Sequence, residues 1–82
     1  DVPMEDTYLD GNSMYVTIDV ANIVDLDEES FELILSHEGK VLQLMRRTQL
    51  RPIKSINLPQ AASSVSDWKL NNGILDITFD TA

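Results

Sequence analysis

The chain has 82 residues, 43% of them hydrophobic, which suits a single domain over residues 1–82 and leaves no room for a second core. It contains no cysteine, which excludes a disulfide framework and a thiolate zinc site and fits the reducing cytoplasm. A formal net charge of −8 argues against nucleic acid as a partner. No apolar run approaches the roughly 18–20 residues of a membrane span.

The charges are divided unequally along the chain. Residues 1–39 hold eleven acids and no Lys or Arg, whereas residues 40–54 hold five cations and no acid. The plain interpretation of the basic segment is a solvated strand pair, since surface charge usually contributes little. The sharper interpretation is a charge-complementary contact between subunits.

Strand patterns dominate the first half of the chain. Residues 8–9 predict a short strand before an Asp-Gly-Asn turn, and residues 14–20 alternate apolar and polar side chains. Acids over residues 25–30 suit a helix N-terminus and predict a single helical turn. Residues 31–36 alternate again, and residues 37–40 form a hairpin loop whose glycine takes the left-handed position.

The second half continues in the same way. Further strands are predicted over residues 41–45, 53–58, 65–70 and 74–79, and Asn72-Gly73 predicts a tight hairpin turn between the last two. About seven short strands with turns every 8–12 residues or so indicate an all-β fold, an antiparallel immunoglobulin-like β-sandwich. A small barrel is the competing architecture.

Several segments, in this order, resemble the α-crystallin domain of small heat-shock proteins. Asn72-Gly73-Ile74-Leu75 is similar to the turn that opens its last strand. Residues 14–22 and 25–33 resemble an earlier strand and the acidic turn that follows it, and residues 53–59 resemble a strand that ends in Leu-Pro. The resemblance spans nearly the whole chain.

The resemblance implies an ATP-independent holdase, or an accessory protein derived from one, that acts in the stress response. Such a protein binds apolar segments of unfolded or partner proteins and forms a homodimer or a small homo-oligomer. In this family a groove beside the strands matching residues 31–36 and 65–70 receives extended peptides. Carried over to this chain, the groove residues are Leu33, Leu35, Trp68 and Leu70.

The chain also departs from the family pattern. The connection over residues 46–52 has no residues for a strand that swaps between subunits, the basic residue of the Leu-Pro strand is Lys54, and the last residues carry no Ile-x-Ile motif. Trp68 stands where the family usually has alanine, so it either fills the groove or anchors a ligand there. These departures favour the alternative function, a co-chaperone or adaptor similar to CS-domain proteins.

No catalytic constellation is present, so the chain is expected not to be an enzyme and to need no cofactor or metal. His37 is the sole histidine and is interpreted as a solvated turn residue. The acids between residues 25 and 29 lack the spacing of a calcium loop. Ser63, Ser64 and Ser66 have no general base nearby in the sequence and are interpreted as a linker.

Overall fold

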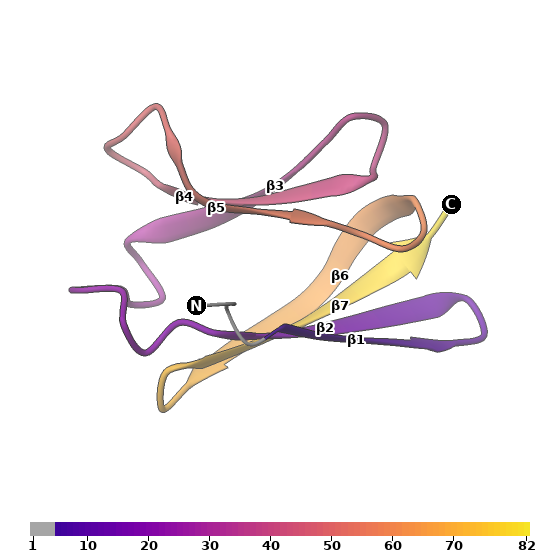
Figure 1. Ribbon diagram of the computed structural model, residues 1–82, viewed down its shortest axis with the longest axis horizontal. Coiled ribbons are helices and arrows are strands. Elements are labelled where there is room, and N and C mark those ends of the chain that lie inside the picture. The colour runs from indigo at the N-terminus through magenta and orange to yellow at the C-terminus, as the bar shows by residue number, and fades with distance from the viewer. Residues whose placement is uncertain (1–4) are drawn as a thin grey trace.

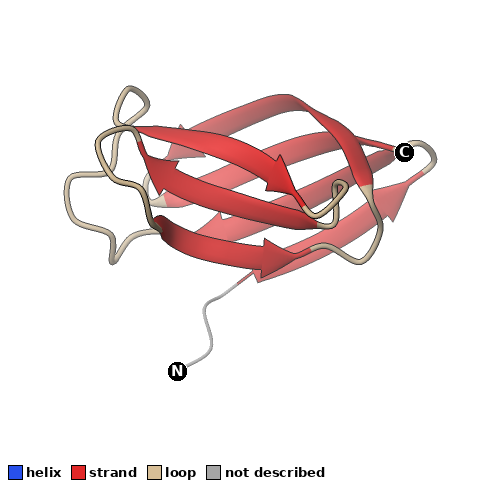
Figure 2. Ribbon diagram, turned by 90° about the horizontal axis from the view of Figure 1, so that it is seen from above, coloured by secondary structure: helices blue, strands red, loops and turns tan. Residues whose placement is uncertain are grey.

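The computed structural model describes residues 5–82 as two antiparallel sheets stacked face to face (Figure 1). One sheet has the strand order β1-β2-β7-β6 and the other the order β3-β4-β5. The strands are β1 (Glu5–Asp10), β2 (Ser13–Asp19), β3 (Phe31–Ser36), β4 (Val41–Arg46), β5 (Pro52–Asn57), β6 (Ala62–Asn71) and β7 (Ile74–Thr81). The smaller sheet lies over the larger one (Figure 2), which confirms the predicted β-sandwich.

The core lies between the two sheets, and its most regular part comes from β2 and β7, which have a neighbour on both sides. β2 and β7 alternate buried and more exposed residues, and their buried residues face one another in the pairs Met14↔Phe79, Val16↔Ile77 and Ile18↔Leu75. From the opposite sheet, Phe31, Leu42, Leu44 and Ile56 close over them, each at most 3% exposed. Central strands therefore carry the clearest alternation, because only they are covered along one whole face.

The loops gather at the two ends of the sandwich. The loop between β2 and β3, the connection between β4 and β5, and the β6–β7 turn lie together at the left in Figure 1. We call this the loop end. The turns after β1 and β3 lie at the opposite end, with the C-terminus.

Two hairpin turns have the backbone conformation that their sequences predict. Asn72 and Gly73 have φ values of 52° and 78°, the positive pair of a type I′ turn. In the β3–β4 hairpin Gly39 is left-handed with φ 87°, as expected, and His37 and Glu38 are left-handed as well, at 54° and 58°. The type I′ turn matches the right-handed twist of β6 and β7.

The helical turn predicted over residues 25–30 is wrong. Asp25 has a φ of 59°, which no right-handed helix accommodates. Asp27 then forms a tight turn, because its carboxylate accepts the amide of Glu29 at 2.9 Å and its carbonyl accepts the amide of Ser30 at 3.1 Å. The acids that suggested a helix start instead stabilise a non-helical turn by local bonds.

β1 is longer than the strand predicted at residues 8–9, because it pairs with β2 along its whole length.

Within residues 5–82 no helix has the length and apolar character needed to cross a membrane.

Candidate functional site

A groove runs between β3 and β6, two edge strands that lie on the same side of the sandwich, one in each sheet. β3 ends the three-stranded sheet and β6 ends the four-stranded sheet, so each has one strand edge without a neighbour in the part of the chain that the structure describes. The groove has a volume of about 250 Å³ and is lined by Phe31, Glu32, Leu33, Arg47, Val65 and Trp68. We call it the β3–β6 groove. An open strand edge beside apolar side chains is the arrangement that accepts an added peptide strand.

Two β-bulges in β6 direct its apolar side chains into the sandwich. Ser63 and Ser66 have no partner in the register with β7, so each is one extra residue in the strand. As a result Val65 and Trp68, three positions apart, both pack against the core. In a regular strand, side chains three positions apart point to opposite faces. The extra residue at Ser66, between Val65 and Trp68, brings both side chains to the same face.

The bulged serines are bonded to the neighbouring strand. The Ser63 hydroxyl donates to the carbonyl of Asp80 at 3.0 Å, and the Ser66 hydroxyl donates to the carbonyl of Thr78 at 3.1 Å. The interpretation of these serines as a linker is therefore wrong, since β6 begins at Ala62 and contains them. These two hydrogen bonds fix the bulges of β6, the strand that forms one wall of the β3–β6 groove.

Trp68 lines the β3–β6 groove on the side that packs against the core. Its ring lies 5.1 Å from the ring of Phe31, centroid to centroid, at an interplanar angle of 58°. Phe31 is buried, whereas Trp68 is only partly buried and keeps a surface on the groove. The tryptophan therefore packs on the core and also lines the groove, and that it anchors a ligand there stays a prediction.

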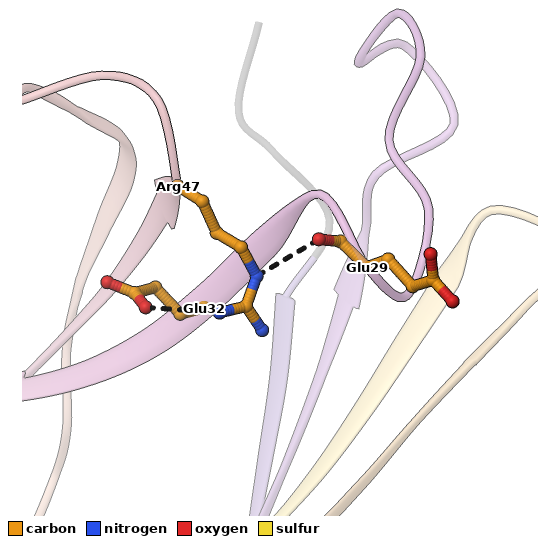
Figure 3. Close-up of polar contacts among 3 residues, drawn as sticks. All are labelled: Glu29, Glu32 and Arg47. Atoms are coloured by element: carbon orange, nitrogen blue, oxygen red, sulfur yellow. Dashed lines mark hydrogen bonds and ion pairs between the residues drawn. The ribbon is translucent and has the colours of Figure 1, made fainter.

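One arginine ties the mouth of the groove to the preceding loop (Figure 3). Arg47 Nε donates to the carbonyl of Glu29 at 3.0 Å, and its Nη1 lies 3.6 Å from Oε2 of Glu32. The backbone amide of Arg47 also donates to the carbonyl of Ser30 at 3.1 Å. Both charged side chains are about half exposed, at 56% and 46%, so their ion pair contributes little energy and chiefly fixes position.

The four predicted groove residues are not all in one place. Leu33 and Trp68 line the β3–β6 groove together. Leu70 instead lines a second hollow of about 350 Å³ at the loop end. Leu35 lines neither and packs against the core, paired with Leu42 of β4. That these residues bind a client stays a prediction.

The second hollow, which we call the end hollow, lies where the β2–β3 loop meets the β6–β7 turn. Its apolar surface comes from Val20, Ile23, Leu26 and Leu70, and its acidic rim from Asp27 and Glu28. Of these six, sequence reasoning assigned only Leu70 to a binding groove, because the residues of the β2–β3 loop have no periodicity that shows which way they face.

Sequence reasoning also missed four residues of the β3–β6 groove, namely Phe31, Glu32, Arg47 and Val65. Phe31 begins the same alternation as Leu33 and could have been found from it. Val65 could not, because the bulge at Ser66 breaks its relation to Trp68.

The remaining candidates show no reactive arrangement. His37 is exposed at the β3–β4 turn, and its Nδ1 lies 3.1 Å from the hydroxyl of the adjacent Ser36. Among residues 5–82 no three acidic, histidine or cysteine side chains gather closely enough to hold a metal ion.

Comparison with known proteins gives matches by structure only. No protein-family model and no curated sequence matches the chain. A point variant of hsp14.1 from Sulfolobus solfataricus P2 is similar with a TM-score of 0.71 and 22% identity, over 99% of this chain and 72% of that one. Heat shock protein 16.0 from Schizosaccharomyces pombe has a TM-score of 0.63 and 12% identity, over 98% and 86%.

A third structure is a C-terminally truncated form of the small heat shock protein AgsA from Salmonella typhimurium. It matches with a TM-score of 0.60 and 21% identity, over 100% of this chain and 89% of that one. Each of the three structures matches nearly the whole of this chain. The chain therefore has the α-crystallin fold of the small heat-shock proteins, in a divergent form.

Proposed function

We propose that this chain is an ATP-independent holdase, or an accessory protein derived from one, that binds extended apolar segments of other proteins in the β3–β6 groove. The observation that carries the proposal is a groove, lined by apolar side chains with Glu32 and Arg47 beside them, between two strand edges that have no neighbour within residues 5–82. The fold shared with small heat-shock proteins supports it. Such a protein is a binding protein and not an enzyme.

The groove supplies two kinds of contact to an extended segment. The edges of β3 and β6 offer backbone amides and carbonyls, which pair with a peptide of any sequence. Leu33, Val65 and Trp68 offer apolar surface, which favours clients whose hydrophobic residues are exposed. Binding of this kind uses no nucleotide. We further infer a cytoplasmic role in the stress response, which the absence of cysteine supports.

The proposal is tested with a pair of adjacent substitutions in β3. Leu33→Asp places a charge in the groove, whereas Ile34→Asp places the same charge on the opposite face of the same strand. Suppression of the heat aggregation of a client, followed by light scattering, is expected to fall at least severalfold for Leu33→Asp and to change little for Ile34→Asp.

Circular dichroism and urea unfolding of both variants separate loss of binding from loss of fold. If both folded variants suppress aggregation as the unchanged chain does, the groove is not the client site. If the unchanged chain itself gives no suppression at equal mass, the holdase function is refuted.

A second function is favoured by the β4–β5 connection. It spans only residues 47–51 and contains no strand, so this connection offers no strand that could be exchanged between subunits. A small assembly of this kind suits an adaptor similar to CS-domain co-chaperones, which docks on one partner. Pull-down of a stoichiometric partner, together with no aggregation suppression, would support the adaptor over the holdase.

A further inference from the structure

The loop end carries the two most exposed large hydrophobic side chains among the described residues. Leu50, in the β4–β5 connection, is 97% exposed, and Val24, in the β2–β3 loop, is 73% exposed. The β2–β3 loop lines the end hollow, and the β4–β5 connection lies at the same end of the sandwich, at the left in Figure 1. An apolar hollow and an uncovered leucine at one end of a small domain mark a contact surface.

The loop that presents Leu50 is held in place. The amide of Gln49 donates to the carbonyl of Arg46 at 3.2 Å, which closes a turn just before Leu50. The Arg46 guanidinium donates to the carbonyls of Val24 and Asp25, so the two loops are joined. Because the turn and these bonds already order the loop, little conformational entropy remains to be lost when Leu50 is buried.

The charges of the two loops are complementary. The β2–β3 loop has four carboxylates, Asp25, Asp27, Glu28 and Glu29, and no cation. Next to Leu50 is the exposed cation Arg51, while Asp27 and Glu28 form the rim of the end hollow. A leucine followed by an arginine therefore matches a hollow with apolar walls and an acidic rim.

We propose that the loop end is a self-association surface, in which Leu50 of one copy enters the end hollow of a second copy and Arg51 pairs with Glu28 there. Leu50 and the end hollow lie at the same end of each molecule. A two-fold axis therefore allows Leu50 of each copy to enter the end hollow of the other copy at the same time. The occupant is a second copy because each loop end carries both halves of the complementary pair. This dimer is separate from client binding, which uses the β3–β6 groove.

Sedimentation velocity of the 82-residue chain across a concentration series tests the dimer. The unchanged chain is expected to pass from monomer to dimer, and Leu50→Ser to raise the dimer dissociation constant about tenfold or more, since one apolar side chain per contact is lost. Leu50 is almost fully exposed in the monomer, so this variant keeps its fold. Tyr8→Thr, which removes a 63% exposed side chain from β1, is the matched control and should leave the dimer unchanged.

A charge exchange tests the pairing itself. Arg51→Glu and Glu28→Arg should each weaken the dimer, and the double variant should restore it at low salt. A chain that stays monomeric up to about millimolar concentration, a Leu50→Ser dimer of unchanged strength, or a double variant without rescue would each overturn the proposal. Assemblies larger than a dimer would overturn the two-fold arrangement.

The two proposals fail independently. Leu50→Ser should still suppress client aggregation, because Leu50 is not part of the β3–β6 groove. Leu33→Asp should still dimerise, because Leu33 is not part of the end hollow.

Discussion

Replacing Gly39 by alanine is expected to loosen the contact between the β3–β4 hairpin and the start of β6. Gly39 is buried and left-handed, with φ 87°. Its carbonyl accepts the amide of Ala62 at 2.9 Å. A Cβ added at Gly39 would lie 2.1 Å from the carbonyl oxygen of Ala62, far inside van der Waals contact, so the two backbones must separate.

The size of the effect follows from these two features. A left-handed alanine costs about 1–2 kcal/mol relative to its preferred conformation. Losing the bond between Gly39 and Ala62 adds about 0.5–1.5 kcal/mol, and separating two packed backbone segments adds more. We expect the free energy of unfolding to fall by about 2–4 kcal/mol. For a domain of this length that lowers Tm by roughly 10–25 °C.

Urea and thermal unfolding followed by circular dichroism measure this change, and Gly11→Ala is the matched control. Gly11 is also left-handed, with φ 62°, but a Cβ there meets no atom within 4 Å. It should therefore lose only the conformational part, about 1–2 kcal/mol. Equal losses for the two variants would show that backbone strain alone matters and would refute the close-contact argument.

Two further substitutions test the groove and its mouth. Trp68→Ala should destabilise the fold by about 2–3 kcal/mol, below the 3–5 kcal/mol typical of a fully buried tryptophan, because its ring packs on Phe31 but stays partly exposed. A loss under about 1 kcal/mol in urea unfolding would contradict that packing, and Trp68→Phe should keep most of the stability. Arg47→Ala should lower stability by only about 1 kcal/mol, because its contacts with Glu29 and Glu32 are exposed. It should nevertheless speed hydrogen exchange at the Glu29 amide, and unchanged exchange would show that Arg47 does not hold the loop.

Much of the fold was predictable because strand alternation and turn chemistry are local. β2 and β7 show a clean period of two, and Asn72-Gly73 tolerates the positive φ that its turn requires. The helical turn over residues 25–30 was not predictable in the same way. Acids suit both a helix start and a capped turn, and bonds made by Asp27 decide between them.

Less of the candidate site was predictable, because its residues come from separate segments. Leu33 and Trp68 were expected together and do line one groove. Leu35 and Leu70 were placed with them by strand membership alone, which does not say how far along the opposing strands the groove extends. Arg47 was not named, although the predicted hairpin brings the chain back beside residues 30–32, because strand pairing does not show that its side chain reaches Glu32 and the groove.

The sequence by itself determined which segments are strands, which turns are tight and where the charges lie, because these depend on residues close together in the chain. Only the tertiary structure decided the two bulges in β6, the meeting of β3 with β6, and the gathering of the Leu50 loop and the end hollow at one end of the sandwich. The reason is physical. Strand register and sheet stacking are set by contacts between residues far apart in the chain, and an alternating pattern states only that a face is buried, not what buries it.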